Sequence, residues 1–261
     1  RLYEILAQVK SRLQMSLSPA GHSVSAIRAM SYFSKSAYFN DMTGGIALYR
    51  VVADYEEHFE EKKAELITKI KALMAKIFCP KRLMVSVTSD EEGKNLVLPE
   101  IEKLKGVLYP DSEIGTLCNI YPKQKNEGFL DASKVQYVSR AGNFVDKGFS
   151  YTGALKILKV ILSYDYLWIN VRVKGGAYGC MSGFMRTGDM YFTSYRDPNL
   201  RKTNEIYEKT PEYLKNFTAD EREMTKYIIG TVSELDTPLN PYAKGMRSLS
   251  AYLMGLSYEA V

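Results

Sequence analysis

Residues 168–199, with the sequence WINVRVKGGAYGCMSGFMRTGDMYFTSYRDPN, contain the pattern that decides the fold of this chain. Apolar residues before them recur at helical spacing, and a glycine pair follows Lys174. Such a pair is a usual end for a helix, because glycine adopts the left-handed turn without a Cβ penalty. We therefore predict that a helix ends near Gly175. Two strands, residues 177–185 and 190–195, should follow as a hairpin across a short polar turn that contains glycine.

Asp197 and Pro198 follow the second predicted strand and together form a start signal for another helix. Aspartate is a favoured N-cap residue, and proline is tolerated at the first helical position, where no backbone N–H is needed. The predicted unit is thus helix, turn, hairpin and helix. It places Arg172 at a helix end and Tyr178 at a strand start, beside a loop with little side-chain bulk. This arrangement suits the binding of an extended peptide.

Several blocks of this region resemble, in order, one enzyme family. The blocks are RVKGGAYG (172–179), SYRDPNL (194–200) and TNEIYEKTPEYL (203–214). They are similar to the last domain of the pitrilysin/insulinase-type zinc metallopeptidases (peptidase family M16), in particular the presequence protease branch (subfamily C), and the similarity is strongest over residues 151–217. The resemblance implies a fragment of the C-terminal half of such an enzyme, in which two halves of two related α+β domains each close around a peptide.

The resemblance also implies roles for residues of the glycine-rich segment. In this family an Arg and a Tyr of the fourth domain, spaced as Arg172 and Tyr178 are, complete a zinc site whose inverted His-x-x-Glu-His motif lies in the first domain. Arg172 and Tyr178 would thus be catalytic, since a guanidinium and a phenol are suitable donors to the negative charge that develops in peptide hydrolysis. Gly175, Gly176 and Gly179 would let the substrate backbone come close. The zinc ligands would lie outside this chain.

Each of these residues also has a purely structural interpretation. Arg172 could complement the dipole at a helix C-terminus, Tyr178 could pack on a strand neighbour, and the glycines could serve turn and cap geometry. The corresponding alternative function is a non-catalytic scaffold or core-like subunit of a pitrilysin-type complex. The presence of both Arg172 and Tyr178 favours the metalloendopeptidase, with a peptide substrate and the N-terminal half of the same protein as partners.

His58, Glu61 and Lys62 belong to a stretch that approaches the inverted zinc motif. Lys62 occupies the position of the second histidine, where a cation opposes metal binding, and the only other histidine of the chain is His22. A catalytic zinc site needs three protein ligands and a water. We therefore predict that this chain binds no metal and is inactive alone, with zinc present only in the full-length enzyme.

Composition restricts the function classes further. Of the 261 residues, 46% are hydrophobic and 25% are charged, as in ordinary globular chains. The net charge of +5 suggests nucleic-acid binding as an alternative function. The basic residues are, however, interleaved with 30 acidic ones, a pattern that is more typical of solvated helix faces. Apolar runs are too short to span a membrane. We expect neither nucleic acid nor membrane as a partner.

Three widely spaced cysteines form no Cys-x-x-Cys pair and favour a reducing compartment, the cytoplasm or an organelle matrix. The chain begins without methionine, so we expect it to be a piece of a longer protein.

The predicted fold class is α+β, with two consecutive pitrilysin-like domains that are both incomplete and in which helices cover an antiparallel sheet. Residues 1–115 would be the C-terminal part of a helix-rich third domain, and residues 116–261 the N-terminal part of the fourth. The boundary is placed within residues 109–127, where the composition shifts to polar residues, Pro and Gly. Other predicted elements are helices at 1–13, 55–78, 93–108 and 246–254, strands at 82–88 and 135–138, and a capping box of Thr218 and Glu221.

Overall fold

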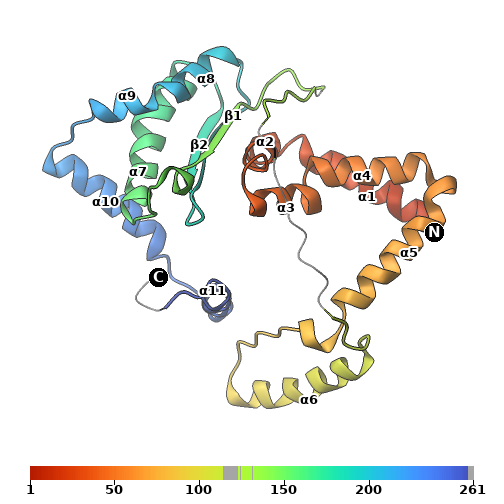
Figure 1. Cartoon of the computed structure of the whole chain (residues 1–261). Helices are drawn as coiled ribbons and strands as arrows, with labels where there is room; N and C mark the ends of the chain where they lie inside the picture. The colour runs from red at the N-terminus through yellow and green to blue at the C-terminus, as the bar shows by residue number, and fades with distance from the viewer. Residues whose placement is uncertain (114–122, 124, 131, 258–261) are drawn as a thin grey trace. The chain divides into compact units, whose positions relative to one another are not determined.

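The computed structural model of the chain describes residues 1–113, 123, 125–130 and 132–257 (Figure 1). It forms two compact units, each built from two stretches of sequence: Arg1–Phe59 with Asn119–Leu235, and Glu60–Cys118 with Asp236–Val261. Helices dominate, and the first unit contains a three-stranded antiparallel sheet. This mixed architecture agrees with the predicted α+β class. The predicted boundary between residues 115 and 116 lies outside the described residues and stays a prediction.

The sheet of the first unit consists of β1 (Ser139–Asn143), β2 (Gly179–Phe184) and β3 (Asp189–Tyr195) in the order β1-β3-β2. Both pairs are antiparallel, which confirms the predicted β2–β3 hairpin. The strand predicted at 135–138 is wrong in position, because β1 begins only at Ser139. An isolated bridge precedes it, in which Gln136 and Asp197 exchange two backbone hydrogen bonds of 2.9 and 2.8 Å.

One face of the sheet is covered by α7 (Ala154–Ile161), the π-helix η3 (Leu162–Val173) that continues it, and α8 (Arg201–Glu208) (Figure 1). Strand residues alternate between faces, so Phe192 points to these helices. Burying each large apolar side chain here contributes about 1.5–3 kcal/mol. The core cluster consists of Val138, Leu162, Tyr166, Leu167, Val171, Ala177, Phe192 and Tyr207.

The opposite face of the sheet packs against α2 (Gly21–Met30) largely through polar contacts. The hydroxyl oxygens of Ser25 and Ser139 lie 2.6 Å apart, and those of Ser139 and Thr193 lie 2.7 Å apart. The Thr193 hydroxyl also donates to the His22 carbonyl over 3.1 Å. These bonds satisfy the buried hydroxyl of Thr193 and the partly buried hydroxyls of Ser25 and Ser139, and they fix α2 on the strands.

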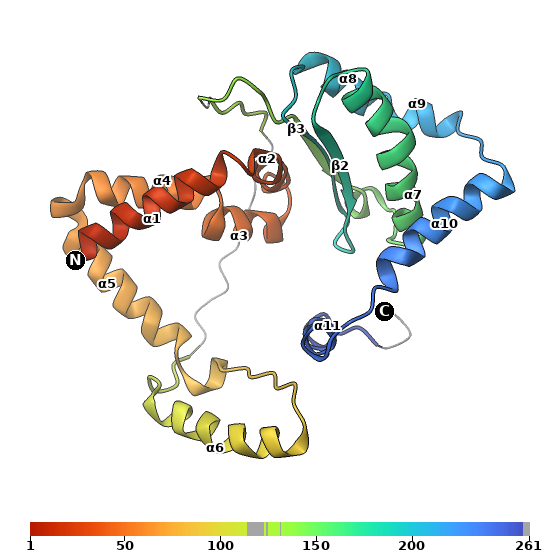
Figure 2. The same ribbon diagram turned by 180° about the vertical axis from the view of Figure 1, so that it is seen from behind.

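The remaining N-terminal helices are α1 (Leu2–Leu17), α3 (Lys35–Gly44) and α4 (Ile46–Glu57), and α4 lies along α1 in both views (Figures 1 and 2). An ion pair of 2.8 Å between Lys10 and Glu56 links α1 to α4. The prediction of one continuous helix over 55–78 is wrong. The backbone leaves the helical region at His58, whose ring nitrogen Nδ1 lies 3.2 Å from the Asp54 carboxylate, and a new helix begins at Phe59.

The second unit contains most of α5 (Phe59–Ile77), with η1 (Pro80–Arg82), α6 (Glu91–Val107) and α11 (Pro241–Leu253). α6 and α11 confirm two predicted helices. The strand predicted at 82–88 is absent: residues 83–88 belong to no helix or strand, although Leu83 has extended backbone angles. A strand needs a neighbour to bond its backbone groups, and none lies beside these residues in the described part of the unit. Met84, Val85 and Val87 are accordingly exposed.

The short helices η2 (Val145–Lys147) and α9 (Thr210–Lys215) and the longer α10 (Glu221–Leu235) complete the first unit. The capping box of α10 lies two positions later than predicted. Asp220 accepts a hydrogen bond of 2.7 Å from the Glu223 backbone N–H, and the Glu223 side chain accepts one of 3.1 Å from the Asp220 backbone N–H. The reciprocal geometry is the predicted one, with Asp220 in place of Thr218.

Candidate functional site

The glycine pair after η3 forms a tight left-handed turn, as predicted. Gly176 has φ = +83°, and its N–H donates to the Arg172 carbonyl over 2.8 Å. A Cβ on Gly175 would lie 2.4 Å from the Val171 carbonyl oxygen, so no larger residue fits there. Both positions therefore have a structural requirement for glycine, whatever further role they have.

Arg172 lies in the last turn of η3, where the backbone is π-helical and Lys174 donates to the carbonyl of Ile169 over 2.9 Å. π-Helical turns are rare and are often found at functional sites. The carbon at the centre of the Arg172 guanidinium lies 3.8 Å from the centroid of the Trp168 ring. At this distance the cation stacks on the aromatic face, which fixes its position while its edge stays free.

A surface pocket of about 470 Å³ lies beside this stacked pair. We call it the Arg172 pocket. Its lining residues are Trp168, Arg172, Val173, Gly176, Ala177 and Tyr178.

Arg172 and Tyr178 present hydrogen-bond donors that nothing in the described chain engages. No carboxylate of the described residues lies within ion-pair distance of Arg172, and the Tyr178 hydroxyl has no hydrogen-bond partner among them. The Tyr178 side chain is 70% exposed, whereas its backbone N–H is fixed to the Tyr195 carbonyl over 2.9 Å. The pocket therefore offers a guanidinium and a phenol to an acceptor such as a carbonyl oxygen.

The structure brings three of the predicted site residues, Arg172, Gly176 and Tyr178, into one pocket. Gly175 and Gly179 do not line it. The Gly175 carbonyl accepts a hydrogen bond from the Asn199 side chain, and Gly179 lines a different pocket.

Asp197 supports this turn, and its side chain is fully buried. Its carboxylate accepts hydrogen bonds from the Asn199 N–H at 2.8 Å and from the Thr203 hydroxyl at 2.7 Å. The prediction that Asp197 is the N-cap of the next helix is wrong, because these bonds close a local turn and α8 starts only at Arg201. Asp197 instead holds Asn199 where it binds Gly175.

Cys180 follows the site on β2 and is partly buried. Burial raises the pKa of its thiol to about 12, although the positive charge of Arg172 opposes this shift. The thiolate is the nucleophilic form of cysteine, and almost none is present near neutral pH. Burial therefore does not favour Cys180 as a nucleophile.

His58 and Glu61 belong to the incomplete zinc motif of the sequence, and that this chain binds no metal stays a prediction. No group of three or more His, Cys, Asp or Glu side chains within the described ranges could hold a metal ion. Within the same ranges, no helix is both long and apolar enough to cross a membrane.

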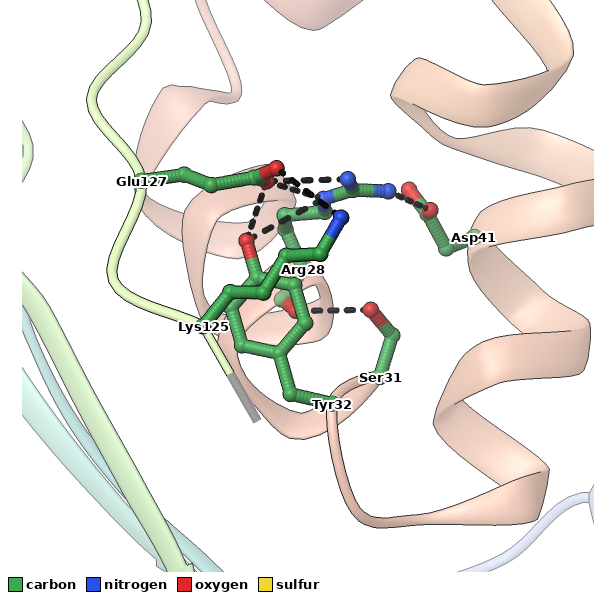
Figure 3. A network of polar contacts seen from close by, with 6 residues as sticks. All are labelled: Arg28, Ser31, Tyr32, Asp41, Lys125 and Glu127. Atoms are coloured by element: carbon green, nitrogen blue, oxygen red, sulfur yellow. Dashed lines mark hydrogen bonds and ion pairs between the residues drawn. The ribbon is translucent and has the colours of Figure 1, made fainter. Parts of the chain in front are cut away.

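A second polar cluster surrounds Arg28 on α2 (Figure 3). Its guanidinium donates to Asp41 over 2.7 Å and to Glu127 over 2.9 Å, and Tyr32 also donates to Glu127. Burial opposes the charge of Arg28, but these bonds outweigh it and raise its pKa. Burial and the bond to Glu127 raise the pKa of Tyr32 to about 12. The cluster fastens residues 125–129 to α2 and α3.

Two protein families match this chain. The family described as "PreP C-terminal domain" matches residues 126–260, and a family of segments associated with subfamily C of the M16 peptidases matches residues 1–55. The first match covers more than half of the 261 residues and includes the whole Arg172 pocket. The chain belongs to the PreP C-terminal domain family, within the presequence proteases of peptidase family M16.

Similar curated proteins agree with this assignment. Protein HypA of Clostridium perfringens is 37% identical over 259 residues, which cover 99% of this chain and 26% of HypA. Presequence protease 1, chloroplastic/mitochondrial, of Arabidopsis thaliana is 28% identical over 262 residues, which cover 99% of this chain and 24% of that protein. The mitochondrial presequence protease of Emericella nidulans is 26% identical over 268 residues, which cover 99% of this chain and 25% of that protein. The chain thus spans about a quarter of the length of these relatives.

Trp168 was not among the residues predicted for the site, which were Arg172, Tyr178 and three glycines. A signal was present, since an aromatic residue four positions before an arginine on a helix lies on nearly the same face. Asp197 was noticed, but its role in holding the turn depends on Thr203 and Asn199 and is visible only in the structure.

Proposed function

We propose that this chain is part of the C-terminal half of a zinc-dependent metalloendopeptidase that degrades peptides in a closed chamber. The proposal includes two consecutive pitrilysin-like domains, with the zinc-bearing N-terminal half as partner. One observation carries it: Arg172 and Tyr178 present unengaged donors in one pocket of a chain that belongs to the presequence protease family. The compartment would be a reducing one, either the cytoplasm or an organelle matrix.

In this proposal Arg172 and Tyr178 are catalytic and act on the scissile carbonyl. A guanidinium and a phenol donate to the carbonyl oxygen, and these bonds strengthen as negative charge develops on it. Stacking on Trp168 positions the Arg172 guanidinium before substrate arrives, and the bond from the Tyr178 N–H to Tyr195 fixes the backbone that carries the phenol. Zinc bound outside this chain would supply the activated water.

In this proposal Gly175, Gly176 and Gly179 are substrate-binding positions, and Gly176 leaves room for the substrate backbone at the pocket itself. Gly176 lines the pocket and carries no side chain over it, and Gly175 and Gly179 flank it in sequence. An extended peptide could then approach the backbone from Gly175 to Gly179 closely. This role is compatible with the turn geometry that Gly175 and Gly176 require.

The test is the variant Tyr178→Phe in the intact protein that contains this chain. It removes one hydroxyl and almost no volume, so folding should be unchanged. Loss of one donor to a developing oxyanion costs about 10²-fold or more in turnover. We expect such a fall in kcat/KM on an unfolded peptide, with zinc content unchanged.

Tyr164→Phe is the matched control, because Tyr164 is exposed, as Tyr178 is, but lies on η3 and does not line the pocket. It should retain full activity. If Tyr178→Phe and Tyr164→Phe behave alike, Tyr178 is not catalytic. If the intact protein hydrolyses no peptide at all, the chain belongs to a non-catalytic subunit instead.

A further inference from the structure

A second surface pocket opens on the other face of the sheet from the Arg172 pocket. Its volume is about 410 Å³. We call it the His22 pocket. Its walls come from the end of α1, the α1–α2 connection, the start of α2, β2 and β3. The lining residues are Ser16, Pro19, Ala20, His22, Gly179, Met181 and Tyr195.

The walls of the His22 pocket are uncharged and largely aromatic or aliphatic. None of its lining residues is Asp, Glu, Lys or Arg. The rings of His22 and Tyr195 meet edge to face at 5.0 Å between centroids, and Tyr137 packs on Tyr195 at 5.8 Å. Burial lowers the pKa of His22, so its imidazole is neutral near pH 7. Such a pocket binds apolar groups and rejects ionised ones, because burying an unpaired charge is costly.

The two pockets flank neighbouring residues at the start of β2. Successive strand residues point to opposite faces, so Tyr178 faces the Arg172 pocket while Gly179 and Met181 face the His22 pocket. Gly179 has no side chain, so it adds no bulk between the two pockets. One step along the chain thus separates the two sites.

β2 is also the terminal strand of the sheet and pairs only with β3 in the described part of the chain. An extended peptide that adds to such an edge places alternate side chains on the two faces of the sheet. A peptide held by Tyr178 on one face would therefore direct a neighbouring side chain toward Gly179 and Met181 on the other.

We propose that the His22 pocket is a specificity site that receives an apolar side chain of the same peptide whose carbonyl binds Arg172 and Tyr178. The inference rests on the proposed peptidase function for its ligand. Leucine, methionine and phenylalanine side chains have the chemistry that these walls accept, whereas lysine and glutamate do not.

The experiment uses the intact protein and a labelled peptide series in which one position after another is Gly, Leu, Phe or Lys. Binding is followed by fluorescence anisotropy, and cleavage is measured in parallel. Ala20→Phe fills the pocket, and Met181→Ala enlarges it. The controls are Ala154→Phe and Met15→Ala, which place the same changes at exposed positions outside the pocket.

We expect one position of the peptide at which Leu or Phe binds about tenfold or more tighter than Lys, the size of effect typical of apolar pockets. Ala20→Phe should abolish this preference, and Met181→Ala should shift it toward Phe. The control variants should keep the preference of the unaltered protein, and the pocket variants should bind the Gly peptide as the unaltered protein does.

The outcomes separate this inference from the peptidase function. If the pocket variants alter the binding preference but no peptide is cleaved, the His22 pocket stands and the peptidase function fails. If cleavage persists with the preference unchanged in folded variants, the pocket is not a specificity site. The absence of any peptide binding overturns both.

Discussion

Arg28 and Arg172 are both partly buried arginines of the first unit, yet their guanidinium groups have opposite surroundings. Arg28 is 14% exposed and is bonded to two carboxylates, Asp41 and Glu127. Arg172 has no carboxylate within reach in the described chain and stacks on Trp168 instead. Figure 3 shows how completely Arg28 is surrounded by partners.

The difference in surroundings indicates which of the two arginines is available to bind a ligand. Carboxylates engage the N–H groups of Arg28 and neutralise its charge, so it stabilises the fold and has nothing to offer a ligand. Stacking holds Arg172 by its face and leaves the N–H groups along its edge available. The first arginine is therefore assigned to structure and the second to function.

The largest effect on stability should follow from Arg28→Ala. Removal of the guanidinium leaves the carboxylate of Asp41, which is 3% exposed, without its cation, and breaking such a buried pair costs about 3–5 kcal/mol. Amide hydrogen exchange in α2 and α3 of the intact protein should accelerate accordingly. Arg12→Ala on the exposed face of α1 serves as the control. Unchanged protection in α2 would show that the cluster is not what holds these helices.

Arg172→Ala should give the converse result. We expect kcat/KM to fall by about 10²-fold or more, because a donor to the developing oxyanion is lost. Hydrogen exchange in the first unit should change by less than about 0.5 kcal/mol, as at other sites outside the core. Arg172→Lys should recover only part of the activity, because lysine keeps the charge but not the planar fork. A large loss of stability with normal activity would reverse the assignment of the two arginines.

Trp168→Leu sharpens the comparison by removing the ring that holds Arg172. A cation–π contact of this kind is worth about 1 kcal/mol, so we expect a fall of roughly fivefold in kcat/KM. Trp168→Phe keeps an aromatic face and should recover most of the loss. Steady-state kinetics of both variants, with zinc content measured, test this. Equal activity of the Leu and Phe variants would mean that stacking does not position Arg172.

The smallest expected effect is a pH dependence of the Arg28 cluster. The hydrogen bond from Tyr32, followed by that from Arg28, lowers the pKa of Glu127 below its usual value of 4.5. A carboxylate with a lowered pKa in the folded state contributes stability that is fully present above its unfolded pKa and is lost as the pH falls through the folded pKa. Exchange at α2 should therefore accelerate below about pH 4.5. Glu127→Gln should reduce the pH dependence of exchange at α2. The same acceleration at low pH in this variant would contradict the role given to Glu127.

The sequence predicted the part of the site that depends on local chemistry. The glycine pair, the alternation of the β2–β3 hairpin and the approach of Arg172 to Tyr178 all arise within residues 172–195. Local patterns of this kind need no knowledge of the rest of the fold, which is why the hairpin was predicted correctly.

The errors occurred where distant residues decide the structure. The alternation at 82–88 satisfies the strand pattern, but no neighbouring strand pairs with it in the described residues of its unit. The Arg28 cluster was not predicted, because Arg28 and Glu127 are 99 positions apart. One error was local: the break at His58 lies at a single residue of an otherwise helical pattern, and no pattern in the sequence indicated it.

The central claim is that Arg172 and Tyr178 act together on one carbonyl, and a double-mutant cycle tests it most directly. It compares Arg172→Ala, Tyr178→Phe and the double variant in the intact protein, with kcat/KM measured on one peptide and zinc content held constant. Donors to the same oxyanion are coupled, so the double variant should lose clearly less than the product of the two single losses. Folded, zinc-loaded single variants that retain near-normal kcat/KM would contradict the claim.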